Sequence, residues 1–277
     1  MKKTIIAAAI AAVAAAPAAM ADVSIYGMAH MDLSDDTLND RASRIGFKGT
    51  EDLGNGMTAS FTYETQVDFQ NAFASTDAAE SAFAKGRHAH VSVGGDFGTV
   101  TAGYVYMPTK GLFGFSKTEI NGDGVADNSA YLMAEPKGEA VQYTGKIGGA
   151  TVKLACAGTQ LCDDTDMTVT TALGSVNLGL GLYSVDGGED TTTIAANTKV
   201  GDLTLGAIYQ DNDAGDATIV SAAYSMGANT IKVSMADKDA AESTNVMVSH
   251  ALSKATSVYV AMDDENDDTA VGLIHKF

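Results

Sequence analysis

Short segments that alternate apolar and polar residues follow one another along the chain from Asp22 onward. In ASFTYETQVDF, Phe61 and Tyr63 alternate with Thr62 and Glu64. This period of two places successive side chains on opposite faces of a β-strand. Segments of about ten residues with this weak alternation, separated by turn residues, are typical of the strands of a membrane β-barrel.

Two kinds of connection alternate between these segments. One kind is tight and mostly glycine-rich (GNG, GGDFG, GGA, LGS, GD, GA, SKA), and the other is longer and acidic (SDDTLNDRA, DGGED, DNDAGD, DENDD). Outer-membrane barrels have short periplasmic turns and longer external loops. We therefore predict an all-β fold, a transmembrane antiparallel β-barrel of sixteen strands, with fourteen as the alternative count. A barrel of sixteen strands is wide enough to enclose an aqueous channel.

One long segment without a strand pattern runs from Pro108 to Pro136. Proline lacks a backbone N–H and is displaced to the ends of strands. A long loop among otherwise brief connections is usually functional. We predict that this loop, residues 108–136, folds into the barrel and narrows the hole.

The N-terminal residues have the pattern of a secretory signal. Lys2 and Lys3 precede an alanine-rich apolar run that ends at Ala19-Met20-Ala21. A short basic stretch, an apolar core and an A-x-A-like site are typical of a signal peptide. We expect export through the Sec pathway, cleavage of residues 1–21, and one barrel domain over residues 22–277.

The charge balance is strongly acidic, with 17 Lys and Arg against 35 Asp and Glu and a net charge of −18. Nucleic-acid binding requires a basic face and is therefore not expected. An acidic channel attracts counter-ions, so the balance predicts mild cation selectivity.

Cys156 and Cys162 are the two cysteines of the chain. Export to an oxidising compartment favours a disulfide between them, and the glycine in the intervening segment allows the chain to turn. We predict a local cross-link in an external loop, with a redox role as the weaker alternative.

Candidate metal and catalytic residues lack supporting context. His88 and His90 share a strand face without a third ligand, and a pore-facing or subunit-contact position is favoured over a metal pair. The acidic segments DNDAGD and DDENDD do not have the spacing of a dedicated calcium loop. We predict no cofactor and no dedicated metal site, with Ca²⁺ bound incidentally to the loops as an alternative. No catalytic constellation is evident, so an enzyme is not expected.

Several motifs resemble those of the Gram-negative general porins, the trimeric diffusion channels of the outer membrane. They are SRIGFKGTEDLGNGM (residues 43–57), VSIYGMAHMDL, GRHAHVSVGGDFGTVTAGY and EAVQYTGKIGGATVKL. Phe277 is similar to the terminal residue that serves as the family's barrel-assembly signal. The chain departs from the family in its reduced external loops and in Tyr104, which stands where an arginine is usual.

The resemblance implies a basic ladder on the pore wall that faces acids on the third loop. Arg44 and Lys48 match by position, and their alternation with Ile45 and Phe47 also turns them inward. Arg87 matches by its local sequence. The expected constriction has a basic side of Arg41, Arg44, Lys48 and Arg87 and an acidic loop side of Glu119, Asp123 and Asp127.

The sequence therefore predicts a passive outer-membrane channel for ions and small hydrophilic solutes. The resemblance implies a homotrimer in contact with the lipid bilayer, lipopolysaccharide and the barrel-assembly machinery. Two alternatives remain: a solute-specific channel, and a surface or structural β-protein with acidic Ca²⁺-binding loops that serves adhesion or the envelope.

Overall fold

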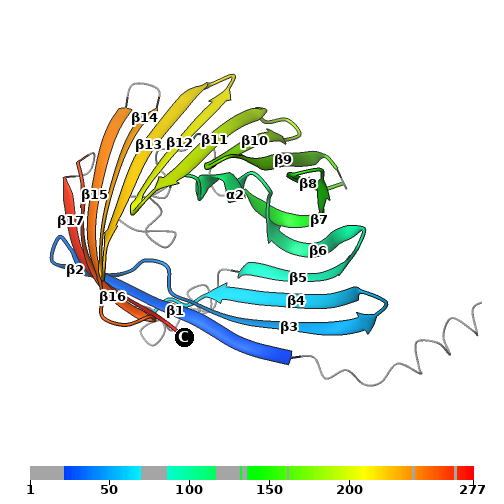
Figure 1. Cartoon of the computed structure of the whole chain (residues 1–277), viewed down its shortest axis with the longest axis horizontal. Coiled ribbons are helices and arrows are strands. Elements are labelled where there is room, and N and C mark those ends of the chain that lie inside the picture. Colours follow the sequence, from blue (N-terminus) through cyan, green and yellow to red (C-terminus); the bar gives the residue numbers. More distant parts are fainter. Residues whose placement is uncertain are drawn as a thin grey trace, which may run out of the picture.

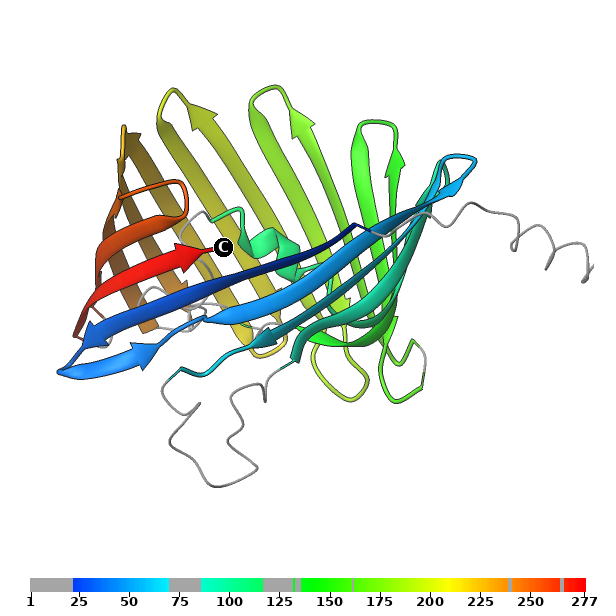
Figure 2. The same cartoon turned by 90° about the horizontal axis from the view of Figure 1, so that it is seen from below.

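A computed structural model describes residues 22–69, 86–116, 132, 136–160, 162–238, 241–264 and 267–277. The expected signal peptide, residues 1–21, lies outside the described residues. The described strands form one closed sheet (Figures 1 and 2). In this part of the chain, no helix is both long enough and apolar enough to cross a membrane.

Seventeen strand segments and one short helix follow each other along the described chain. They are β1 (Asp22–Ser34), β2 (Thr37–Asp40), β3 (Arg44–Gly54), β4 (Met57–Gln66), β5 (Gly86–Gly95), β6 (Gly98–Tyr106), α2 (Lys110–Phe113), β7 (Lys137–Ile147), β8 (Ala150–Ala157), β9 (Asp164–Leu173), β10 (Val176–Ser184), β11 (Thr191–Val200), β12 (Leu203–Asn212), β13 (Gly215–Met226), β14 (Asn229–Lys238), β15 (Ala241–Ala251), β16 (Thr256–Asp263) and β17 (Asp268–Lys276).

From β3 to β17, consecutive strands pair antiparallel, and β17 pairs with β1 to close the sheet. β2 and β3 pair with opposite halves of β1 and together form one strand position of the barrel. The seventeen segments therefore occupy sixteen positions. The fold class and strand count that the sequence predicts are confirmed.

The first hairpin is longer than its sequence suggests. The acidic segment SDDTLNDRA was expected to be a loop, but β2 lies within it and pairs Thr37–Asp40 with Met31–Ser34 of β1. Only Asp35 and Asp36 connect the two strands, both at positive φ. That expectation was wrong because backbone pairing across the hairpin continues through the polar residues.

The connections lie at two ends of the barrel, which we name the turn end and the loop end. The turn end carries the seven tight connections that follow β3, β5, β7, β9, β11, β13 and β15, together with the start of β1 and the end of β17. At this end, Asn55 and Gly56 both have positive φ, the conformation that tight hairpin turns require. The loop end carries the other connections. Several of these are also short, because the ladder extends into them, as between β12 and β13.

The two faces of the wall differ in polarity. In β10, Leu178, Leu180 and Leu182 are exposed on the outer face, while Gly179 and Gly181 between them are buried on the inner face. Figure 1 shows α2 inside the ring of strands, and Leu112 of α2 would meet a Cβ placed on either glycine. Gly179 and Gly181 therefore face the barrel interior, and so do the residues that pair with them on the neighbouring strands.

The C-terminal residue completes the closure at the turn end. The Phe277 N–H donates to the Gly27 carbonyl at 3.1 Å, and the Gly27 N–H donates to the Phe277 carbonyl at 3.0 Å. The last residue thus extends the β1–β17 ladder and leaves less unpaired backbone at the seam. A role of Phe277 in assembly stays a prediction.

We expect Leu180→Arg to lower the free energy of unfolding in a phospholipid bilayer by about 2–4 kcal/mol, because it places a charge on the apolar face near the middle of β10. Denaturant unfolding of protein refolded into vesicles measures this loss. Thr170→Arg makes a similar change on the inner row of β9 and should cost less. Equal losses would contradict the assignment of the two faces.

Candidate functional site

Arg44 and Lys48 lie on the inner row of β3. Arg44 pairs with Gln66 and Lys48 with Thr62 of β4, and residues paired in this way share a face of the sheet. Phe47 has the opposite parity and is exposed on the outside. The structure therefore places both predicted basic residues on the wall of the barrel interior.

Arg87 also contacts this wall, although simple alternation would place it with the outward Val91. The ladder between β4 and β5 shifts register between Glu64 and Thr65, and this bulge re-aims the side chain. Arg87 Nε lies 2.8 Å from Glu64 Oε1, and Arg44 Nε lies 4.0 Å from the same oxygen. One buried carboxylate thus holds two of the predicted arginines together.

Aromatic and imidazole rings extend this cluster toward the long segment. The Arg87 guanidinium lies 5.5 Å from the centre of the Tyr106 ring. The centre of the His88 ring lies 5.0 Å from the centre of the same Tyr106 ring. His90 lies 5.6 Å from His88. These histidines and Tyr106 line a cavity of about 300 Å³ that Lys110 also borders.

Arg41 belongs to a different cluster. It lies in the break between β2 and β3, and its Nε is 2.6 Å from Asp32 Oδ2. The Tyr259 hydroxyl donates to the same Asp32 oxygen at 3.0 Å and lies 2.8 Å from His30 Nε2. Because Tyr259 is on β16, this network ties the two sides of the barrel seam. The four predicted basic residues therefore fall into two groups.

The described start of the long segment is fixed to the inner wall by Asp166 of β9. The Thr109 N–H donates to Asp166 Oδ2 at 2.9 Å, and the Thr109 hydroxyl donates to Oδ1 at 2.6 Å. Both residues are buried. Hydrogen bonds to an ionised carboxylate are among the stronger ones in proteins, so Asp166 anchors the chain just before α2.

A row of glycines on the facing strands, which we name the glycine cradle, makes room for this segment. It consists of Gly179, Gly181 and Gly206. A Cβ on Gly179 or Gly181 would lie 2.6 or 2.9 Å from Leu112, and a Cβ on Gly206 would overlap the Phe115 carbonyl. A larger residue at Gly206 would collide with the backbone of the segment, whereas at Gly179 or Gly181 the Leu112 side chain would have to shift. The sequence therefore encodes the seat of α2 in strands that follow it.

The far end of the long segment also contacts the wall. The Leu132 N–H donates to Gln210 Oε1 at 3.1 Å, and Gln210 is fully buried on the inner face of β12. The predicted acidic partners Glu119, Asp123 and Asp127 lie outside the described residues. An inward fold of the whole loop, and a constriction with these acids, stay predictions.

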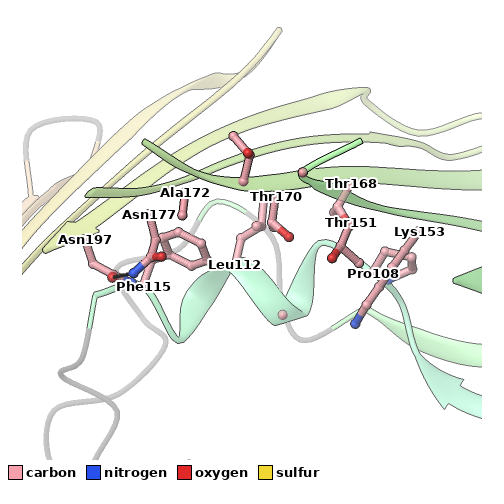
Figure 3. Close-up of a pocket in the computed structure, with 13 residues that line it drawn as sticks. Pro108, Leu112, Phe115, Thr151, Lys153, Thr168, Thr170, Ala172, Asn177 and Asn197 are labelled. Carbon is pink, nitrogen blue, oxygen red and sulfur yellow. Dashed lines mark hydrogen bonds between the residues drawn. The ribbon is translucent and has the colours of Figure 1, made fainter. Parts of the chain in front are cut away.

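A second cavity, of about 490 Å³, lies between α2 and the inner face of β8–β11 (Figure 3). Thr151, Thr168, Thr170, Asn177 and Asn197 supply hydroxyl and amide groups to one side of it. Leu112 and Phe115 form an apolar side, and Lys153 lies beside Pro108 (Figure 3). The space is polar, water-accessible and lined by the barrel wall.

Cys156 and Cys162 are joined by a disulfide at the loop end of β8. Cys162 has a φ of 72°, a conformation that places it in the turn after the strand. Among the described residues, there is no group of three or more His, Cys, Asp or Glu side chains that could hold a metal ion. The loop calcium alternative stays a prediction.

These features define a class of protein: a closed antiparallel barrel with apolar residues outside and charged, hydrated residues inside. A wall of this kind separates lipid from a polar interior and leaves no backbone edge unpaired. The family model described as "Gram-negative porin" matches residues 7–270. The chain belongs to this family.

Known proteins show the same relationship. The chain is 33% identical over 122 residues to outer membrane porin protein 32 of Delftia acidovorans and 34% identical over 127 residues to major outer membrane protein P.IB of Neisseria gonorrhoeae. These matches cover 39% and 40% of this chain. The chain spans about a third of the length of each of these curated relatives, 33% and 34%.

Solved structures match over nearly the whole chain. An anion-selective porin from Comamonas acidovorans has a TM-score of 0.67 at 20% identity and covers 93% of this chain and 100% of its own. Salmonella typhi OmpF, in complex with daunomycin, has a TM-score of 0.74 at 15% identity and covers 92% and 97%. At such low identity these matches establish the fold alone.

Three residues of the inner wall were missed as site residues by sequence reasoning. Glu64 was placed on the polar face of its strand but not recognised as the partner of Arg44 and Arg87. Asp166 and Tyr259 are distant in sequence from the residues that they bind. The position of Glu64 on the polar face, close to two arginines on the neighbouring strands, could have suggested its role. The contacts of Tyr259 depend on the closure of the barrel, and those of Asp166 depend on the course of the loop.

We expect Asp166→Ala to release the start of the long segment, because two donors of Thr109 lose their acceptor and each unsatisfied group costs about 1–3 kcal/mol. Hydrogen exchange followed by mass spectrometry should show faster exchange over residues 107–116 with unchanged protection of the strands. Asp190→Ala, an exposed loop substitution, is the control. Unchanged exchange over residues 107–116 would contradict the anchor.

Proposed function

We propose that the protein is a passive diffusion channel of the Gram-negative outer membrane for ions and small hydrophilic solutes. The observation that carries the proposal is the charged inner wall, where Arg44, Glu64 and Arg87 face a barrel interior lined by water-accessible cavities. A purely structural β-protein would not need charged side chains on an inner wall beside water-accessible cavities. The mechanism is diffusion, and no enzymatic step is part of it.

The first test is single-channel conductance of the purified protein in a planar lipid bilayer. We expect stepwise increases in current, grouped in threes if the protein is a homotrimer. Folded, detergent-soluble protein that never conducts would contradict the channel function. That outcome would favour a surface or structural β-protein with acidic loops, the alternative from another functional class.

Two sets of charges act on the ion selectivity in opposite directions. The net charge of −18 favours cations, as does the acidic loop end. The described inner wall carries Arg44, Lys48 and Lys153, which favour anions. We infer that any cation preference is weak, and the anion-selective name of the Comamonas acidovorans structure is consistent with a wall that reduces it. A large reversal potential across a salt gradient, of either sign, would contradict this inference.

We expect Glu64→Gln to shift the reversal potential toward anion preference, since it removes a negative charge from between Arg44 and Arg87 on the wall. Glu51→Gln is the matched control. Glu51 pairs with Ala59 on the outer row of β3, the row of the exposed Phe47, so the same change of charge should leave the reversal potential nearly unchanged. Equal shifts in both variants would place Glu64 outside the ion path.

The assembly that we propose follows the family. Residues 1–21 direct export and are removed, Phe277 engages the barrel-assembly machinery, and the folded barrel contacts lipid and lipopolysaccharide as a homotrimer. The loop acids Glu119, Asp123 and Asp127 face the basic wall at the constriction. A solute-specific channel is a second candidate within the same class, and the hydroxyl-rich cavity beside α2 favours it.

A further inference from the structure

Lysine side chains gather on the inner wall near the turn end. They come from strands far apart in the sequence and lie within four residues of a turn-end strand terminus: Lys146 of β7, Lys153 of β8, Lys199 of β11, Lys232 of β14 and Lys276 of β17. We name these five residues the lysine arc.

The register places the members of the lysine arc on the inner face. Lys199 lies two residues from Asn197, which pairs with Gly206 of the glycine cradle. Lys153 pairs with Thr168, which in turn pairs with Gly181 of the cradle. The remaining three follow from the same ladders, since Lys146 pairs with Thr151, Lys232 with Ala223, and Lys276 with Met28.

The described acidic residues at the turn end lie outside the sector of the lysine arc or in turns. Asp96 and Asp202 lie in the turns, and Glu51 is on the outer row of β3. Asp22 of β1 and Asp52 of β3 share the inner row with Lys48, so the basic sector of the wall runs from β7 to β17 and does not include β1 and β3. From β7 round to β17, the described charges on the inner wall near the turn end are lysines.

The loop end has the opposite charge. Its described connections and adjoining strand ends carry many carboxylates: Asp35, Asp36, Asp163, Asp164, Asp186, Glu189, Asp190, Asp211, Asp213, Asp216, Asp263, Asp264, Asp267 and Asp268. The described cations near this end are fewer: Arg41, Arg44, Arg87, Lys110, Lys137 and Lys238. The barrel is thus polarised along its axis, acidic at one mouth and basic on the wall toward the other.

We propose that this polarity makes the pore a current rectifier. The inference rests on the channel function proposed above. The acidic mouth concentrates cations and the lysine arc concentrates anions, so the two regions act in series with opposite preferences. When the loop side is positive, cations enter through the acidic mouth and anions enter past the lysine arc, and both accumulate inside. With the opposite voltage, both ions are drawn out and the pore is depleted.

The size of the effect follows from the range of the charges. A unit charge about 10 Å away across water changes the local concentration of a monovalent ion by about twofold before screening. At 0.1 M salt the Debye length is about 10 Å, and at 1 M it is about 3 Å. The current ratio at opposite voltages should therefore be roughly twofold at 0.1 M salt and close to one at 1 M, where the charges are screened.

The test is the current–voltage curve of single insertions of the full-length folded protein at both salt concentrations. The larger current should flow with the loop side positive. Orientation is assigned with Asp213→Cys at the tip of the β12–β13 connection, by adding a bulky membrane-impermeant thiol reagent to one side. The triple variant Lys146→Glu, Lys153→Glu, Lys199→Glu should lose the asymmetry, and the matching Lys→Gln variant should reduce it.

Lys238→Glu is the matched control. Lys238 shares the inner row, since it pairs with Ala217, but lies at the loop end. The same charge reversal there should keep or increase the rectification. Symmetric curves at 0.1 M salt from a conducting wild-type pore would overturn the polarity inference while leaving the channel function intact. Asymmetry that survives in the triple variant would also overturn it. Absence of any conductance would instead contradict the channel function itself.

Discussion

Closure of the backbone ladder is the constraint on which the rest of the structure depends. A strand that faces lipid has no water to satisfy its N–H and C=O groups, so every strand needs two neighbours. The chain meets this requirement by pairing β17 with β1 and by extending the ladder to Phe277 and Gly27. Once the ring is closed, the alternation of side chains alone decides what faces lipid and what faces the interior.

Closure also decides which distant residues meet. Tyr259 and Asp32 are 227 positions apart and bind each other only because the first and last strands are neighbours. The Asp32 carboxylate then holds Arg41 at the break between β2 and β3. The polar network at the seam is therefore a consequence of the ring, and it strengthens the one join that short local hairpins do not make.

The strands and the polarity of their faces could be predicted from the sequence, because both rest on local alternation and turn residues. This rule correctly predicted that Arg44 and Lys48 lie on the inner wall. The inward position of Arg87 depends on a bulge beside Glu64, and no sequence pattern predicts this bulge. β2 was hidden because its residues are polar, and backbone pairing does not depend on apolar side chains. The binding of Thr109 by Asp166 joins residues 57 positions apart and needed the fold.

The glycine cradle has a consequence for how such loops are exchanged. The seat of α2 is formed by Gly179, Gly181 and Gly206, which lie on strands well beyond the segment that they hold. A loop transplanted from a relative would arrive without its seat, and a larger residue at Gly206 would collide with the backbone of the segment held there. Engineers who graft a new constriction into this barrel would therefore have to move the loop and its distant wall as one unit.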